Sequence, residues 1–340
     1  MSYSLLEDAH AVILPAFAST SLSDECKRFL DRGGSSILIG ESRNEYVARQ
    51  MSFERRCTET AESFTSLVGE AKKLSNNLLV AVDQELGGIC RMHDLVPQFP
   101  TNEELIGMSA SEVEDITYRV AKASQALGVN VFLAPIVDLV TGVNPWLDGR
   151  TYSTDPEVVG RVSAAFVRGV QKAGVAATAK HFPGFHNITG DPAIDANAHV
   201  EDDADSYAPG FNPFADVIAA EVEMIMVGPA INKAFDPARA ALRSKPVIEI
   251  LKLDLRYQGI VMADNLDSKA TMHGDSIEKV AVDAIRAGCD LLLTPDVGTQ
   301  LEEVSKTLIN AVETGNISRD ALAQSADKIR RLAQKYTAKL

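Results

Sequence analysis

The chain has 340 residues, of which 46% are hydrophobic, and a formal net charge of −14 at pH 7. Length and composition are those of a globular protein with a large core, organised as one large barrel or as two smaller domains. The acidic charge and the lack of a basic stripe argue against a nucleic-acid partner. No stretch approaches the roughly 20 apolar residues that span a bilayer, so a membrane partner is not expected either.

The N-terminal segment and the cysteines predict the compartment. The segment MSYSLLEDAHAVILPAF carries acidic residues where a signal peptide has a basic region, and its apolar run is short. Cys26, Cys57, Cys90 and Cys289 lie far apart, without the spacing of a zinc site or a disulfide framework. We therefore expect a cytoplasmic protein with no metal site.

Short apolar runs alternate along the chain with segments of helical period. Continuous hydrophobicity in the runs is typical of parallel strands covered on both faces. The helical segments, among them SDECKRFLDRG and SIEKVAVDAIRAGC, open with Ser or Asp caps and close near Gly. The apolar runs begin at Ala11, Ser35, Asn77, Val129, Val175, Glu223, Gly259 and Cys289.

Eight strand–helix units predict an α/β fold, a single (β/α)8 TIM-type barrel. A doubly wound open sheet is the alternative, but no G-x-G-x-x-G follows the first run. Because no Pro-, Gly- or Ser-rich linker interrupts the pattern, we expect one catalytic domain over residues 1–340. Helices at about 300–340 are expected to end it.

Charged residues stand at the ends of several predicted strands, where barrel enzymes have their sites. Two carboxylates with a cationic group among them suit glycoside hydrolysis, in which one carboxylate attacks the anomeric carbon and a proton donor serves the leaving oxygen. Each Asp taken alone also fits a helix cap or a loop bridge, but their shared position favours a common pocket. These residues are Asp83, Asp138, Lys180, His181, Asp264 and, near the last run, Asp296.

Five segments in this order carry a family resemblance: AVDQELGGICR, FLAPIVDL, NPWLDGRTYSTDPEVVG, AKHFPG and GIVMADNLDSKA. Together they resemble glycoside hydrolase family 3, in particular its single-barrel, NagZ-like β-N-acetylglucosaminidase branch. The resemblance implies a retaining exo-β-N-acetylglucosaminidase (a β-N-acetylhexosaminidase) acting on a small carbohydrate, without metal or cofactor. It also implies that Asp264 is the nucleophile and that the sugar is held by Asp83, Arg91, Arg150, Lys180 and His181.

Electrostatics supports the role of Asp264, because nearby Lys180 and Arg150 would lower its pKa and keep it anionic. Structural alternatives remain for the other positions. Arg150 and Asp83 also fit a salt bridge that fixes barrel loops, and His181 also fits a packed histidine that donates to a carbonyl.

The loop KHFPGFHNITGDPAIDANAH departs from the resemblance at the acid–base position. The branch uses a His–Asp dyad in a pattern resembling H-F-P-G-H-G-D-x-x-x-D-S-H. Here an insertion precedes Gly190, Asp195 falls on the dyad Asp, and Asn197 stands where the His is expected. An asparagine side chain cannot act as a general acid, whereas a histidine beside an aspartate can donate a proton near neutral pH. A displaced dyad of His199 with Asp195, a donor at His186, and a lost acid function are the three alternatives.

Three other functions stay open. Asn197 favours a sugar-binding protein of the same fold with impaired catalysis. A β-glycoside phosphorylase would use phosphate in place of water. An aldolase would use Lys180 as a Schiff base.

Overall fold

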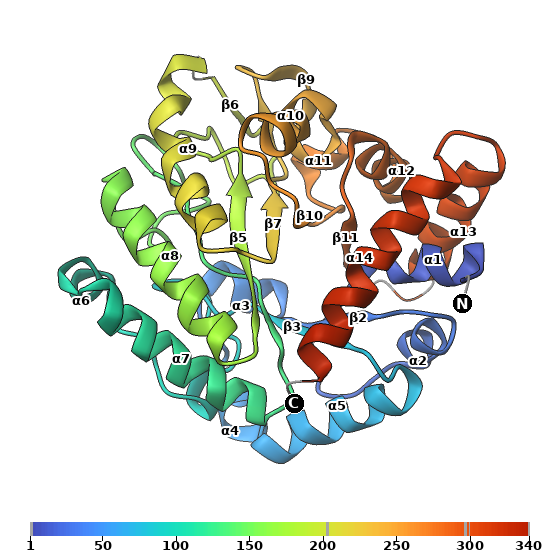
Figure 1. The fold of residues 1–340 in the computed structure, drawn as a ribbon, viewed down its shortest axis with the longest axis horizontal. Helices are drawn as coiled ribbons and strands as arrows, with labels where there is room; N and C mark the ends of the chain where they lie inside the picture. The colour runs from blue at the N-terminus through green and yellow to red at the C-terminus, as the bar shows by residue number, and fades with distance from the viewer. Residues whose placement is uncertain (1–2, 202–203, 296–297, 299, 339–340) are drawn as a thin grey trace.

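The structure, a computed structural model, describes residues 3–201, 204–295, 298 and 300–338. Its centre is a closed barrel of parallel strands (Figure 1). The barrel closes because β1 pairs with both β2 and β11. Its strands are β1 (Ile13–Phe17), β2 (Ser36–Ile39), β3 (Leu79–Val82), β4 (Val131–Phe132), β5 (Ala176–Phe182), β7 (Met224–Val227), β10 (Ile260–Ala263) and β11 (Leu291–Thr294).

Each barrel strand lies within one of the apolar runs, so the predicted (β/α)8 barrel is confirmed and the doubly wound sheet is wrong. The strands are apolar throughout because side chains fill the barrel interior while helices cover its outside. All residues of β2, β3 and β10, for example, are buried.

The helices that follow the strands begin at predicted caps. The Ser109 hydroxyl accepts a hydrogen bond from the Glu112 backbone nitrogen, and the Glu112 carboxylate accepts one from the Ser109 backbone nitrogen, which satisfies two otherwise unpaired donors. Gly288 ends α12 at φ 117°, a left-handed conformation that favours glycine. The helices are α1 (Leu5–Ala11), α2 (Asp24–Asp31), α3 (Arg43–Ala48), α4 (Phe53–Thr58), α5 (Ala61–Leu74), α6 (Asn102–Gly107), α7 (Ala110–Ala126), α8 (Pro156–Lys172), α9 (Ala204–Ala219), α10 (Lys245–Glu249), α11 (Lys269–Met272), α12 (Ile277–Ala287), α13 (Gln300–Glu313) and α14 (Arg319–Thr337).

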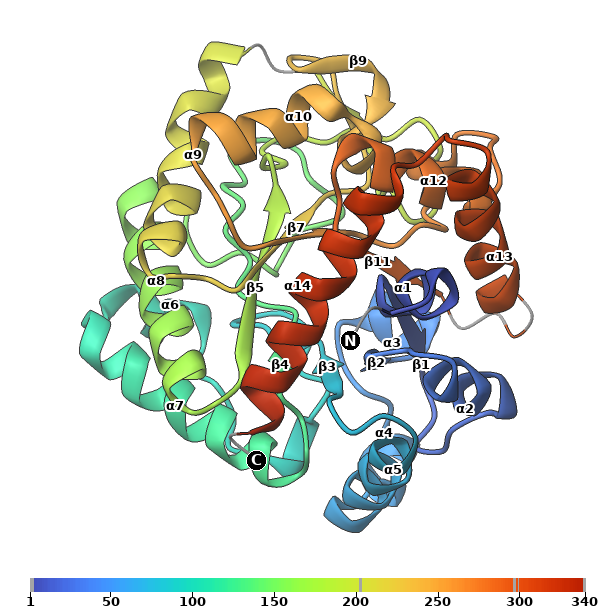
Figure 2. The ribbon, with the colours of Figure 1, turned by 45° about the vertical axis from the view of Figure 1, so that its right-hand side comes forward.

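The first and last helices of the chain lie side by side (Figure 2). Buried Asp8 of α1 forms ion pairs of 2.6 Å with both Arg319 and Arg330 of α14. The helices expected at about 300–340 are α13 and α14, and α14 completes the outer layer across the barrel. No helix in the described part of the chain is both long and apolar enough to cross a bilayer.

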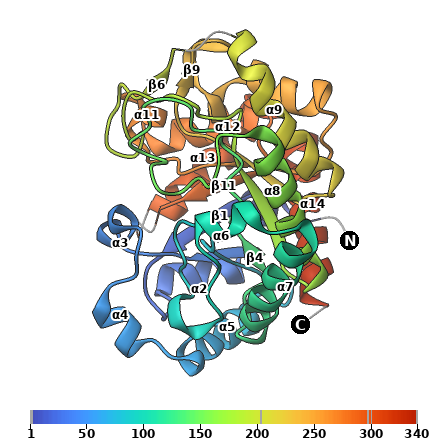
Figure 3. The same ribbon diagram turned by 90° about the vertical axis from the view of Figure 1, so that its left-hand side faces the viewer.

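A second, small sheet was not predicted. It joins β6 (His199–Val200), β8 (Ile231–Asn232) and β9 (Asp236–Ala240), with β6 parallel to β8 and β9 antiparallel to it. Its strands β6 and β8 follow the C-terminal ends of β5 and β7, and β6, α3 and α11 lie along one side of the molecule (left in Figure 3). This sheet fixes the backbone at His199, which matters for the site.

Candidate active site

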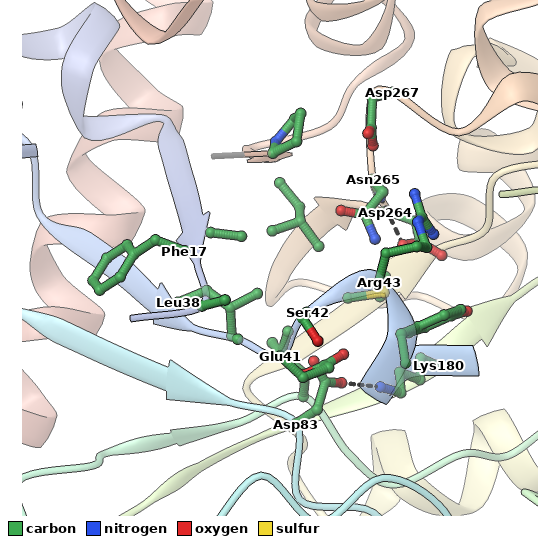
Figure 4. Close-up of a pocket in the computed structure, with 18 of the residues that line it drawn as sticks. Phe17, Leu38, Glu41, Ser42, Arg43, Asp83, Lys180, Asp264, Asn265 and Asp267 are labelled. Atoms are coloured by element: carbon green, nitrogen blue, oxygen red, sulfur yellow. Dashed lines mark hydrogen bonds and ion pairs between the residues drawn. The ribbon is translucent and has the colours of Figure 1, made fainter. Parts of the chain in front are cut away.

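A cavity of about 430 Å³ opens where the barrel strands end (Figure 4). Its lining comes from the ends of several strands, from α3 and from the loops after β4 and β10. The predicted residues that line it are Asp83, Arg150, Lys180, His181 and Asp264. The C-terminal end of a barrel is where such enzymes bind substrate, so this cavity is the candidate active site.

Buried ion pairs form the floor of the cavity. Lys180 Nζ lies 2.6 Å from Asp83 Oδ1 and 2.7 Å from Glu85 Oε1. Arg150 donates to the same Glu85 through Nη2 (2.6 Å) and Nε (3.2 Å). Burial opposes the ionised form of Glu85, but the charges of Arg150 and Lys180 prevail and hold its pKa well below the usual range.

The network clarifies the roles of Glu85, Arg150 and Asp83. Glu85 was missed by the sequence analysis, although it stands in the quoted segment AVDQELGGICR. For Arg150 and Asp83 the alternatives were a structural salt bridge and a place in the binding site. Both apply, since each residue forms a salt bridge and each also lines the cavity.

His181 is held by an aspartate rather than by a carbonyl. Its Nδ1 and its backbone nitrogen each lie 2.9 Å from Asp138 Oδ2, and its ring packs against Trp146 at 4.4 Å between centroids. A carboxylate at Nδ1 favours the proton on that nitrogen, which leaves Nε2 for a substrate hydroxyl. Asp138 is therefore a support for His181, while Asp296 lies outside the described residues.

Asp264 follows β10 directly and is only 7% exposed. Its Oδ1 accepts from the backbone nitrogen of Asn265 at 2.6 Å. Burial raises the pKa of Asp264, and the charges of His181, Lys180 and Arg150 oppose that rise. The expected net lowering is therefore wrong in direction, because desolvation at this depth outweighs the cations.

Glu41, on the turn between β2 and α3, adds a carboxyl group that the sequence analysis missed. It lines the cavity, and its Oε2 is buried with no hydrogen-bond partner among the described residues. Burial, followed by the charges of Asp83 and Glu85, raises the pKa of Glu41 to about 8. The floor thus holds three carboxyl groups for the two cations Lys180 and Arg150, and the raised pKa of Glu41 favours its protonated form.

Replacing Glu41 by Gln is expected to change how stability depends on pH. A carboxyl pKa raised from 4.5 to about 8 on folding means that the folded chain keeps a proton that the unfolded chain loses, so wild-type stability falls as pH rises through this window. Glu41→Gln removes that fall, and its free energy of unfolding relative to wild type should rise by at least about 1 kcal/mol between pH 5 and pH 9. Urea unfolding at each pH measures the free energy of unfolding. If the free energy of unfolding depends on pH in the same way for both proteins, the prediction is wrong. Glu70→Gln, at an exposed pair with Lys27, is the control.

Arg91, predicted to bind the sugar, does not line the cavity. It is fully buried, with Nε 2.6 Å from the carbonyl of Gly40 and its two terminal nitrogens 2.7 and 2.8 Å from the Glu59 carboxylate. Gly40 does line the cavity, so Arg91 positions the cavity wall. Direct contact of Arg91 with substrate stays a prediction.

The displaced dyad is not formed in this structure, and neither of its members lines the cavity. His199 Nε2 lies 2.6 Å from Glu201 Oε1, and its Nδ1 lies 2.6 Å from the carbonyl of Asn197. Asp195 instead accepts from the backbone nitrogen of Asn197 at 2.9 Å. The physical reason is that pairing of His199 with Ile231 in the small sheet holds this backbone, while Glu201 attracts the imidazole.

The second candidate donor also lies outside the cavity lining. His186 is buried, its Nδ1 is 2.7 Å from the carbonyl of Leu139, and its ring packs against Tyr207 at 4.7 Å. Among the described residues, no group of three or more His, Cys, Asp or Glu side chains is placed to hold a metal ion.

Fold and site together define a class. A closed (β/α)8 barrel with carboxylates, cations and a carboxylate-held histidine converging at its strand ends is a barrel enzyme for a small polar substrate. Residues 37–332 match the family model described as the glycosyl hydrolase family 3 N terminal domain. The chain belongs to glycosyl hydrolase family 3, and the predicted resemblance is confirmed.

Curated relatives and solved structures agree with this assignment. The chain is 28% identical over 293 residues to a beta-hexosaminidase of Idiomarina loihiensis, covering 83% of each chain, and 26% identical over 326 residues to one of Methylococcus capsulatus, covering 90% of this chain and 93% of the other. It also resembles the structure of a family 3 beta-N-acetylglucosaminidase from Paenibacillus sp. FPU-7, with a TM-score of 0.88 and 26% identity. That comparison covers 100% of this chain but 64% of the Paenibacillus chain. The barrel is that of a glycoside hydrolase.

Proposed function

We propose that the chain is a retaining exo-β-N-acetylglucosaminidase with Asp264 as its nucleophile. The observation that carries this proposal is that Asp264 lines the same cavity as Asp83, Arg150, Lys180 and His181. Relatives named beta-hexosaminidase support the choice of a β-N-acetylhexosaminide as substrate.

The geometry supports a two-step mechanism. The sugar lies over the floor, where Lys180, Asp83 and Arg150 offer hydrogen bonds to its hydroxyl groups and His181 offers Nε2. Asp264 attacks the anomeric carbon and forms a glycosyl-enzyme, while the bond to the leaving oxygen breaks and that oxygen takes up a proton. Water then attacks the same carbon from the vacated side and Asp264 leaves, so the configuration is retained.

The predicted proton donor is His199, paired with Asp195. It can serve as the donor only if the loop after β5 rearranges. Both its ring nitrogens are engaged outside the cavity in the present arrangement. Comparing His199→Ala with His186→Ala on a substrate with a poor leaving group tests this prediction. A negligible loss for His199→Ala rejects it.

The proposed function is tested with 4-nitrophenyl β-N-acetylglucosaminide and the matching β-glucoside. We expect turnover of the first in preference to the second, with the β-anomer as the first sugar released in proton NMR. Measurable binding of N-acetylglucosamine without turnover of either substrate would favour the sugar-binding alternative. Formation of a glycosyl phosphate in phosphate buffer would favour the phosphorylase.

The aldolase alternative is disfavoured by the setting of Lys180. Burial lowers the pKa of this amine, but the charges of Asp83 and Glu85 outweigh it and raise the pKa above its usual value. A Schiff base needs the neutral amine, which this ion-pair network suppresses. Borohydride trapping with a carbonyl substrate should therefore label nothing at Lys180.

Three finer expectations accompany the proposal and stay predictions. They are the preference for an N-acetylated sugar, a single catalytic domain over residues 1–340, and a cytoplasmic location.

A further inference from the structure

The proposed mechanism needs a proton donor, and the residues predicted for that role lie outside the cavity. Two carboxyl groups that the sequence analysis did not single out lie inside it: Glu41 and Asp267. In a retaining glycosidase the two carboxyl groups flank the glycosidic bond about 5–5.5 Å apart, the nucleophile facing the anomeric carbon and the general acid facing the leaving oxygen. The two candidates differ in how they lie relative to Asp264.

Asp267 stands three residues after Asp264, on the loop between β10 and α11. This spacing limits the separation of the two Cα atoms to about 11 Å even in an extended chain. The loop is shorter than that limit, because Ser268 N donates to Asn265 O at 3.2 Å. In Figure 4 the half-buried Asp267 side chain points from the loop toward Asn265 and Asp264.

The loop that carries Asp267 is anchored on both sides. Leu266 is fully buried, and its backbone nitrogen donates to Leu293 O of β11 at 3.1 Å. Ala270 N donates to Pro192 O at 3.0 Å, which joins this loop to the one after β5. The carboxyl group of Asp267 is therefore held at the cavity wall by ordered backbone.

Burial raises the pKa of both aspartates, but the charged groups that act on the two carboxyl groups differ. At Asp264 the rise caused by burial is opposed by the side chains of His181, Lys180 and Arg150. Burial raises the pKa of Asp267 and the Asp264 charge adds to this rise, while Arg43 and a backbone hydrogen bond oppose it. Neighbouring carboxyl groups in unequal fields divide into a nucleophile and an acid, as catalysis requires.

Glu41 is less suited to this role. It lies at the opposite end of the cavity from Asp267, beside Asp83 and next to the Lys180 ion pairs (Figure 4). That position is on the floor, where the mechanism places sugar hydroxyls, and the charges that act on Glu41 come from Asp83, Glu85, Lys180 and Arg91.

We propose that Asp267 is the general acid–base of this chain, in place of the histidine whose position Asn197 occupies. The proposal rests on the proposed hydrolase function. In the first step the Asp267 O–H proton passes to the glycosidic oxygen as its bond to C1 breaks and the Asp264 oxygen bonds to C1. In the second, the Asp267 carboxylate takes a proton from water as the water oxygen bonds to C1 and the Asp264–C1 bond breaks.

The test compares leaving groups in Asp267→Ala, with Asp267→Asn as an isosteric second variant. A general acid contributes about 10²–10⁴-fold, so kcat/KM for N,N′-diacetylchitobiose should fall by that factor. With 2,4-dinitrophenyl β-N-acetylglucosaminide, whose leaving group needs no proton, formation of the glycosyl-enzyme should change by less than about tenfold. Azide, an acceptor with no proton to lose, should restore slow turnover of the glycosyl-enzyme in Asp267→Ala and yield the β-glycosyl azide.

The matched controls are Glu41→Gln and His199→Ala. Each is expected to affect both substrates by the same factor and to show no azide product. Equal losses on the two substrates for Asp267→Ala, or leaving-group dependence in His199→Ala instead, overturn the role of Asp267. Failure of the proposed hydrolase function gives a different result. In that case the wild-type chain shows no turnover, or turnover survives in Asp264→Ala.

Discussion

Replacing Asp264 with Ala is expected to lower kcat on 4-nitrophenyl β-N-acetylglucosaminide by at least about 10³-fold, or about 4 kcal/mol in activation free energy. The carboxylate supplies the bond to the anomeric carbon, and no other group substitutes for that bond. Binding of N-acetylglucosamine should persist, because Asp83, Lys180 and Arg150 keep their ion pairs without Asp264.

Steady-state kinetics and a trapping experiment check this expectation. A slow fluorinated N-acetylglucosaminide should add its glycosyl mass to the peptide that contains Asp264. Asp94→Ala, at an exposed carboxylate paired with Arg56 outside the cavity lining, is the matched control and should keep wild-type turnover. Retained turnover in Asp264→Ala, or label on another peptide, would contradict the assignment.

Replacing Glu85 with Ala is expected to cost about 3–5 kcal/mol of unfolding free energy. Glu85 is fully buried and is the shared partner of Arg150 and Lys180, so its loss leaves two buried cations with one carboxylate, Asp83, bound to only one of them. An uncompensated buried charge costs far more than a lost surface pair.

Urea unfolding measures this cost against Glu70→Ala. Glu70 pairs with Lys27 at the surface, where both side chains are 39–45% exposed, so the control should lose less than about 1 kcal/mol. Glu85→Gln should lose an intermediate amount, since the amide keeps the volume but not the charge. Equal losses for Glu85→Ala and Glu70→Ala would show that the floor network does not stabilise the barrel.

Glu41 and Asp267 are cavity carboxyl groups to which the family resemblance assigned no role. Glu41 lies beside Asp83 and Glu85 on the floor of the cavity with its pKa raised, and Asp267 follows Asp264 on the loop after β10. Both carboxyl groups occur in a chain that has Asn197 at the expected histidine position. The leaving-group comparison therefore also decides between a competent enzyme and a binding protein.

Among the site residues, those at strand ends were predictable and those set by loops were not. Asp83 and Asp264 directly follow β3 and β10, and Lys180 and His181 lie in the last residues of β5, so identifying the strands also located these side chains. Glu85 and Asp267 stand two or three residues beyond strand-end aspartates in quoted segments, but only their contacts show that they belong to the site. Glu41 follows a strand closely as well, yet nothing in its sequence context indicates a buried carboxyl group.

For His199 and Arg91 the sequence pattern did not predict which groups the side chains contact. Both stand near motif positions, but β6 is a two-residue strand whose pairing with β8 has no local signature, and it holds His199 beside Glu201. Arg91 reaches Glu59 and the Gly40 carbonyl, 32 and 51 residues away in the chain. Such contacts depend on how distant loops meet.

The amino-acid sequence by itself determined the barrel and the strand ends, because hydrophobic periodicity and helix caps are local properties that the chain carries wherever it folds. Only the tertiary structure decided which charged groups share the cavity and in which direction their pKa values are shifted. Those properties depend on burial and on charges brought together from remote loops, as at Glu41 beside Asp83 and Glu85, and Asp267 beside Asp264 and Arg43.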